Sequence, residues 1–88
     1  MWILYIIKCN DNSLYTGITS DLKKRLTQHR KNKGAKYTRG RGPFKLLLIE
    51  KYQTRSDAAK REYQIKQLSR PQKVHQISLG ISKRKNKT

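Results

Sequence analysis

Cysteine is nearly absent from this chain of 88 residues, which contains Cys9 alone. A single cysteine excludes an internal disulfide and any zinc site built on several cysteine ligands. Cys9 lies between an apolar run and a polar turn, so we expect it to be a small packing residue beside that turn. Because nothing in the cysteine content points to secretion, the default expectation is a cytoplasmic protein.

Long hydrophobic runs are also missing. The apolar start, residues 1–7, is far shorter than the roughly 20 residues of a transmembrane helix. No basic region precedes it and no small-residue cleavage site follows it, so it is predicted to be a strand and not a signal peptide. The basic segments carry few large apolar residues for insertion into a membrane surface, so we expect no membrane association.

Acidic side chains are scarce as well, because Asp and Glu number 5 against 22 Lys and Arg, which gives a formal charge of +17. A charge of this size predicts a polyanionic partner, since neutralising phosphates and releasing their counterions drives such binding. Nucleic acid is the first candidate, and an anionic membrane surface is the weaker second. The length and an apolar content of 34% allow one domain with a modest core.

The few acids also limit the kind of metal site. A two-metal centre needs several converging carboxylates. Asp11 lies in a predicted turn, while Asp21 and Asp57 lie at predicted helix starts, where capping already accounts for them. A site with one carboxylate, completed by water and substrate oxygens, suits the coordination habits of Mg²⁺. If the protein binds a metal, we therefore expect one ion and not two, Mg²⁺ or Mn²⁺ in its place.

The order of hydrophobic patterns and turn signals predicts three strands. Residues 2–8 form a run rich in Ile and aromatic residues, too short for a helix and predicted to be covered on both faces. A turn signal at residues 10–13 makes residues 14–19 the returning strand of a hairpin. Gly17 in that strand indicates a position that another group approaches closely. The third strand is predicted over residues 44–52, with Phe44, Leu46 and Leu48 on one face and Leu47 and Ile49 on the other.

Capping residues predict the helices. Residues 19–21 begin a helix that runs to about Lys31, and Thr54 begins another that runs to Ser69, where Pro71 stops it. One short helical turn is expected around residues 35–38 within the loop 33–43, and a last turn or two over residues 72–79. The predicted α+β domain therefore covers residues 1–79, and residues 80–88 are expected to be a disordered basic tail.

Glu62 is the most informative residue of the chain. A carboxylate in a packing face is costly unless it is paired or bound to a cation. One interpretation is a salt bridge to Arg25 or Lys66, and the other is a Mg²⁺ ligand. The residues that share its helical face are Ala58, Ile65 and Ser69.

Four further residues suit phosphodiester hydrolysis. The Arg25 guanidinium can stabilise charge on a phosphate, and His29 can take or relay a proton near neutral pH. Tyr5 and Tyr15 are candidate general bases, although a phenol with a pKa of about 10 needs positive charge nearby. Solvated or packing roles are the competing interpretation for all four. The two tyrosines share a face only in some hairpin registers, and the sequence leaves the register open.

The loop over residues 33–43 is predicted to contact nucleic acid, with Tyr37 stacking on a base and two arginines holding the backbone. The alternative is a flexible charged connector. The predicted nucleic-acid-binding residues are Lys24, Lys36, Tyr37, Thr38, Arg39 and Arg41.

Taken together, these residues resemble the motifs of the GIY-YIG nuclease superfamily. The runs YTGITSDLKKRLTQH, KGAKYTRGRGPF and EYQIKQLSR are similar to its small stand-alone bacterial branch, over about residues 2–77. Ile3, Leu4 and Thr16 depart from the two triplets, and because they only frame the tyrosines we expect altered packing and retained activity. The residues that carry the resemblance are Ile3-Leu4-Tyr5, Tyr15-Thr16-Gly17, Arg25, His29 and Glu62.

The resemblance implies a three-stranded antiparallel sheet flanked by helices and divalent-metal-dependent cleavage of DNA. By this resemblance one of Tyr5 and Tyr15 is the base, Arg25 stabilises the phosphate, His29 assists and Glu62 binds the metal. Larger relatives, which include repair and homing enzymes, carry a separate DNA-binding domain. This domain must choose its substrate with its own surface, which favours single-stranded or branched DNA and leaves RNA open. The alternative function is a non-catalytic nucleic-acid-binding module with a vestigial site.

Overall fold

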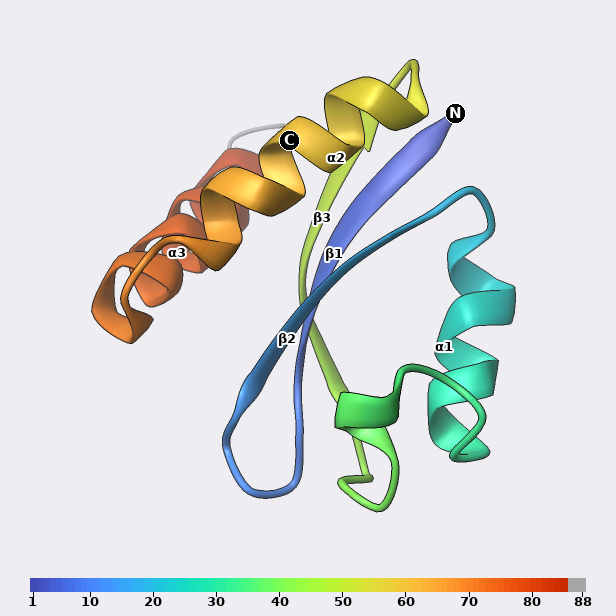
Figure 1. Ribbon diagram of the computed structural model, residues 1–88. Helices are drawn as coiled ribbons and strands as arrows, with labels where there is room; N and C mark the ends of the chain where they lie inside the picture. Colours follow the sequence, from blue (N-terminus) through green and yellow to red (C-terminus); the bar gives the residue numbers. More distant parts are fainter. Residues whose placement is uncertain (86–88) are drawn as a thin grey trace.

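The described part of the protein folds as one three-stranded sheet with three α-helices and one 3₁₀ helix (Figure 1). The computed structural model describes residues 1–85, except for the side chains of Lys36 and of residues 81–85. The strands are antiparallel in the order β2-β1-β3, which confirms the predicted α+β class. The elements are β1 (Trp2–Lys8), β2 (Leu14–Thr19), α1 (Leu22–Arg30), the 3₁₀ helix η1 (Lys36–Thr38), β3 (Lys45–Tyr52), α2 (Arg55–Lys66) and α3 (Arg70–Lys85).

The two faces of the sheet are covered by different elements. Figure 1 shows α1 and η1 on one side of the sheet and α2 and α3 on the other. The apolar core lies on the second side and contains Leu4, Ile6, Leu48, Ile65 and Ile77. The alternate side chains of β1, including Tyr5, point toward α1 and η1. The central strand is therefore covered on both faces, as predicted.

A bulge in β3 changes which of its side chains share a face. Ile6 is opposite Leu48, but the next residue, Ile7, is opposite Leu46, so the pairing skips Leu47. Neighbouring residues of β1 point to opposite faces, which places Leu46 and Leu48 on opposite faces too. The predicted alternation of β3 is therefore wrong, because the extra residue at the bulge shifts its phase.

The predicted helix starts are confirmed. The Asp21 side chain accepts a hydrogen bond from the Lys24 N–H at 3.1 Å, and the Thr54 side chain accepts one from the Asp57 N–H at 3.1 Å. Cys9 is 2% exposed and packs beside the turn that joins β1 and β2. Local capping patterns thus set where α1 and α2 begin.

The helix ends differ from the prediction. α2 ends at Lys66 and not at Ser69, and Pro71 lies in the first turn of α3, where its missing N–H leaves no helical hydrogen bond unmade. α3 then continues to Lys85. An added Cβ at Gly80 would lie 2.3 Å from Leu48 Cδ1, so this glycine allows α3 to approach β3. The predicted disordered tail is therefore wrong for residues 80–85, and residues 86–88 lie outside the described part.

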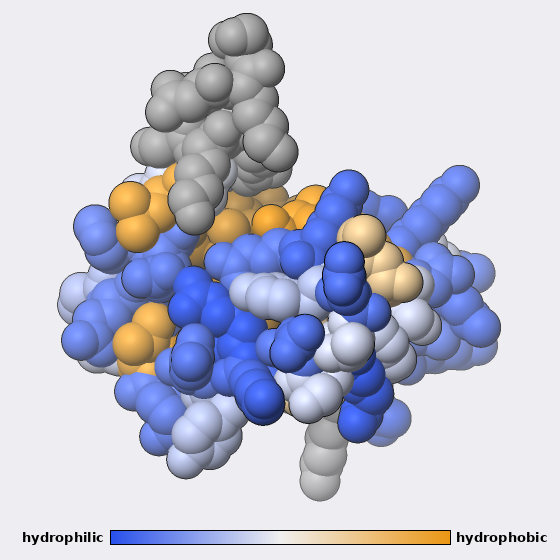
Figure 2. Space-filling view, turned by 90° about the horizontal axis from the view of Figure 1, so that it is seen from above, coloured by the Kyte–Doolittle hydropathy of each residue, from blue (hydrophilic) through white to orange (hydrophobic). Residues whose placement is uncertain are grey.

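One face of the molecule is mostly hydrophilic (Figure 2). Figure 2 shows one face, on which hydrophilic side chains surround small hydrophobic patches. Within residues 1–85, no helix is long and apolar enough to span a bilayer.

Candidate functional site

A chain of hydrogen bonds links β1, α1 and η1. The Tyr5 hydroxyl lies 2.8 Å from His29 Nε2, and His29 Nδ1 lies 2.8 Å from Thr38 Oγ1. Thr38 Oγ1 donates its proton to the Ala35 carbonyl oxygen at 2.9 Å, so only its lone pairs face His29. We therefore assign the proton of the neutral imidazole to Nδ1. His29 Nε2 then accepts the hydrogen bond that the Tyr5 hydroxyl donates.

The three side chains that form this hydrogen-bonded chain are buried. Tyr5 is 0% exposed, and His29 and Thr38 are each 1% exposed. An added Cβ at Gly34 would lie 2.4 Å from His29 Nδ1, so this glycine allows the loop to close over the imidazole. Thr38 was predicted to contact nucleic acid, but its side chain points inward to His29. A threonine in a basic loop carries no local signal of this role, because the contact exists only once the loop has folded onto α1.

Tyr5 and Tyr15 lie on the same face of the sheet. In the hairpin, Tyr5 is opposite Gly17 and Ile7 is opposite Tyr15, so the two tyrosines are diagonal neighbours with ring centroids 6.3 Å apart. An added Cβ at Gly17 would lie 2.6 Å from the Tyr5 hydroxyl oxygen. The register that the sequence left open thus brings both tyrosines together, and Tyr5 is the group that approaches Gly17 closely.

Arg25 of α1 adds a positive charge beside both tyrosines. Burial by itself would lower the pKa of Arg25. The neighbouring hydroxyls of Tyr5 and Tyr15 raise it by more, so the pKa of Arg25 lies above its ordinary value. The guanidinium donates a 3.1 Å hydrogen bond to Gln28 Oε1 and forms no salt bridge with any acid of the described residues. Arg25 is therefore a charged group whose interactions leave it free to pair with an anion.

The Tyr5 hydroxyl is the point at which the predicted residues meet. Burial raises the pKa of Tyr5 to about 12, and the charges of Arg25, Tyr15 and Glu62 all act on it, with Arg25 lowering the pKa and the other two raising it. Glu62 lies on α2, which packs against β1 and β2, the strands that carry Tyr5 and Tyr15. The site thus joins residues from β1, β2, α1 and α2.

Glu62 itself is paired with Lys66. Its side chain is 23% exposed, and its Oε2 lies 3.2 Å from Lys66 Nζ, which confirms the salt bridge predicted as one interpretation. Within the described residues, no three His, Cys, Asp or Glu side chains come together as a metal site. Glu62 fits the alternative role as well, because Mg²⁺ is commonly held by one or two carboxylates, with water and phosphate oxygens completing its shell.

The predicted nucleic-acid-binding residues fall into two groups. Lys24 and Arg39 are exposed, and Tyr37 is 45% exposed. Arg41, in contrast, forms a salt bridge with Asp11, and its guanidinium lies 4.6 Å from the centre of the Tyr37 ring. The side chain of Lys36 lies outside the described part.

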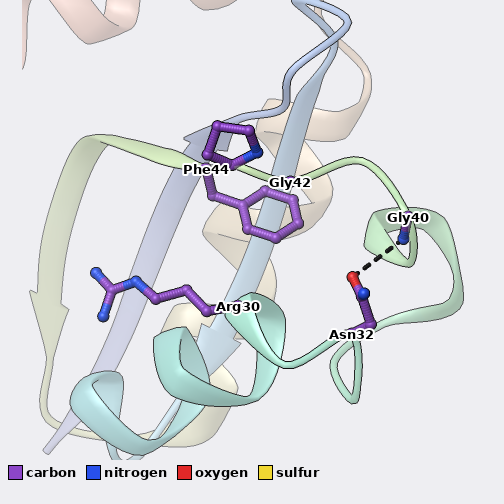
Figure 3. Close-up of a pocket in the computed structure, with 6 residues that line it drawn as sticks. Arg30, Asn32, Gly40, Gly42 and Phe44 are labelled. Atoms are coloured by element: carbon purple, nitrogen blue, oxygen red, sulfur yellow. Dashed lines mark hydrogen bonds between the residues drawn. The ribbon is translucent and has the colours of Figure 1, made fainter.

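A pocket of about 440 Å³ lies where the loop 33–43 meets the end of α1 (Figure 3). No acid lines it, and the Asn32 side chain accepts a 3.1 Å hydrogen bond from the Gly40 N–H at its rim. Phe44, on its wall, also makes an edge contact with His29, with ring centroids 5.8 Å apart. The lining residues are Arg30, Asn32, Gly40, Gly42, Pro43 and Phe44.

Acid is expected to destabilise the protein through His29. Burial, followed by the charge of Arg25, lowers the pKa of His29 below its ordinary value of about 6.5. The unfolded chain therefore binds a proton on His29 below about pH 6.5 while the folded protein does not, so stability falls as the pH drops through that range. The melting temperature, measured from about pH 8 to pH 5, should show this fall in the native protein. His29→Gln should flatten it, and an equal fall in that variant would assign the effect to other groups.

Comparisons with known proteins identify the family of this chain. The family model described as the GIY-YIG catalytic domain matches residues 1–75. The chain belongs to the GIY-YIG family. Members of this family are generally endonucleases that use divalent metals, so the fold implies a nucleic-acid substrate.

Similar proteins of this family are small. A UPF0213 protein of Oceanobacillus iheyensis is 53% identical over 74 residues, which cover 84% of this chain and 86% of that protein. A UPF0213 protein of Halobacterium salinarum is 50% identical over 70 residues, covering 80% of this chain and 91% of that protein. The solution NMR structure of a UPF0213 protein from Bacillus halodurans matches with a TM-score of 0.60 and 45% identity, covering 90% of this chain and 85% of that one. This GIY-YIG protein therefore shares both sequence and fold with the small UPF0213 proteins.

Proposed function

We propose that this GIY-YIG protein is a metal-dependent DNA endonuclease whose catalytic residues are Tyr5, Tyr15, Arg25, His29 and Glu62. The observation that carries the proposal is the hydrogen bond from Tyr5 to His29, with Arg25, Tyr15 and Glu62 acting on the same hydroxyl. A hydroxyl within hydrogen-bond reach of a base that is itself oriented by a third group is a recurrent arrangement of catalytic sites.

Tyr5 and His29 supply the proton transfer. As a water molecule attacks phosphorus, the Tyr5 oxygen takes a proton from that water, and the Tyr5 hydroxyl proton passes to His29 Nε2. The raised pKa of Tyr5 and the lowered pKa of His29 keep both groups neutral at rest. We assign the base to Tyr5 because its hydroxyl has a proton acceptor, while the half-buried Tyr15 helps to hold Arg25 and the water.

Arg25 and Glu62 serve to offset the negative charge of the phosphate and of the leaving oxygen. Arg25 pairs with the non-bridging oxygens of the scissile phosphate and stabilises the charge that develops there. Glu62 would hold Mg²⁺, or Mn²⁺ in its place, and when bound the cation neutralises charge on the leaving oxygen. The Lys66 ammonium occupies one oxygen of Glu62 in the structure, so this lysine must give way to the cation.

Single-stranded or branched DNA is the substrate that we propose. The Tyr5 side chain is buried, so the scissile phosphate must enter a recessed site to reach its hydroxyl. A flexible strand can bend into such a site, whereas a regular duplex resists bending over a few base pairs. Lys24 and Arg39, both exposed, are available to hold the backbone on the way in.

A cleavage assay on matched single-stranded, branched and duplex DNA tests the function. We expect products from the first two substrates with Mg²⁺ or Mn²⁺ and none with EDTA. Glu62→Gln should abolish the response to metal, whereas the control Asp57→Asn, an exposed acid on the same helix, should keep it. Efficient cutting of duplex DNA would overturn the substrate assignment, and metal-independent cutting would overturn the role of Glu62.

The second candidate function is a nucleic-acid-binding module without catalysis. The observation that favours it is the salt bridge of Glu62 with Lys66, which can make the carboxylate purely structural. Tight binding of DNA without products, unchanged in Glu62→Gln, would favour this function over the nuclease.

A further inference from the structure

A second cleft crosses the edge strand β2. It has a volume of about 340 Å³ and lies between η1 on one side and the end of α2 with the start of α3 on the other. Its lining residues are Leu14, Tyr15, Thr16, Tyr37, Lys66 and Lys73. Neither lysine was among the residues predicted from the sequence to bind nucleic acid, and the tertiary structure adds both.

The cleft suits an anion. Two lysines and no acid line it. Lys66 is engaged by Glu62, whereas Lys73 forms no salt bridge with any acid of the described residues. Because the Lys73 ammonium has no carboxylate partner among the described residues, its charge favours a negatively charged ligand in the cleft.

The cleft also adjoins the candidate catalytic centre on two sides. Tyr15, on its floor, lies with its ring centroid 5.4 Å from that of His29 and 6.3 Å from that of Tyr5. Lys66, on its wall, contacts Glu62 at 3.2 Å. A strand whose scissile phosphate reaches Arg25 and Tyr5 therefore has a neighbouring nucleotide within reach of this cleft.

We propose that the cleft binds the phosphate next to the scissile one on the same strand, with Lys73 as its main cation. This inference rests on the proposed function. Leu14 and the tyrosine rings offer apolar walls to the sugar and base, which inorganic phosphate would leave unused. The Tyr37 ring already stacks on Tyr15, at 6.0 Å between centroids, and contacts Arg41. These two contacts position the Tyr37 ring as a wall of the cleft.

The test compares single-stranded oligonucleotides that differ by one phosphate. Oligothymidylates with one, two and three phosphates are titrated into the full-length protein in EDTA, and affinities come from NMR chemical shifts. For the native protein we expect the second phosphate to raise the affinity about tenfold, as one charge-assisted contact does. Lys73→Gln should lose this gain. The control Lys60→Gln, an exposed lysine on α2 outside the cleft, should keep it.

Each other outcome counts against the proposal. An equal loss in Lys60→Gln would indicate general charge attraction, and a gain that persists in Lys73→Gln would place the second phosphate elsewhere. Inorganic phosphate that binds the cleft as tightly as the longer ligands would make it a simple anion site. Failure of every oligonucleotide to bind would also overturn the proposed phosphate site. The nuclease is judged separately, because these titrations need no cleavage: binding with the expected gain but no cutting would refute the enzyme and keep the cleft.

Discussion

Arg25→Gln is expected to lower kcat for DNA cleavage by about 10³-fold, or about 4 kcal/mol of transition-state stabilisation. The guanidinium lies beside Tyr5 and Tyr15 and has no carboxylate partner within the described residues, so its charge is available to the phosphate. The charge on phosphorus grows in the transition state, so the loss should fall on kcat more than on binding.

Two variants control the Arg25 experiment. Lys23→Gln removes one positive charge from an exposed position of the same helix and should change kcat little. Arg25→Lys keeps the charge but cannot pair bidentately with the phosphate, so it should recover only part of the rate. A rate in Arg25→Gln within about tenfold of the native rate would show that Arg25 does not meet the developing charge.

Thr38→Val is expected to cost about 2 kcal/mol of folding stability and to slow cleavage by about 10²-fold. Valine has nearly the shape of threonine but accepts no hydrogen bond, so the buried Nδ1–H of His29 would lose its partner. The imidazole could then move its proton to Nε2, and the Tyr5 hydroxyl would lose its acceptor. Threonine thus acts on the reaction through His29, as a positioning residue.

The tautomer of His29 separates this role from simple packing. Nitrogen-15 NMR of the ring should show the proton on Nδ1 in the native protein, and a mixture or the other tautomer in Thr38→Val. Thr38→Ser keeps the hydroxyl and should restore both the tautomer and most of the rate. A native protein with the proton on Nε2 would contradict the hydrogen-bond polarity assigned here, whatever the variants do.

Local patterns in the sequence were enough for most of the elements. Asp21 and Thr54 cap the helices that they were predicted to cap, because capping depends on residues three apart along the chain. The Glu62–Lys66 salt bridge was also predictable, since residues four apart on a helix are neighbours. These contacts are short in sequence, so their geometry follows from the helix itself.

Contacts between distant segments depended on the fold. The bulge that skips Leu47 depends on how β3 pairs with β1, and no residue of β3 alone signals it. The hairpin register, which puts Tyr5 and Tyr15 on one face, depends on how the turn closes. Thr38 meets His29 only when the loop folds onto α1, and Lys73 reaches β2 only through the turn between α2 and α3.

The sequence by itself determined the charge and the residue types of this protein: a strong positive charge, few acids, and the tyrosines, arginine, histidine and glutamate of a GIY-YIG domain. Only the tertiary structure decided how these groups act on one another. It placed the Tyr5 hydroxyl on His29, turned Thr38 inward and put Lys73 beside the site. Residue types are encoded locally, whereas distances between side chains far apart in the chain are set by the packing of the sheet and its helices.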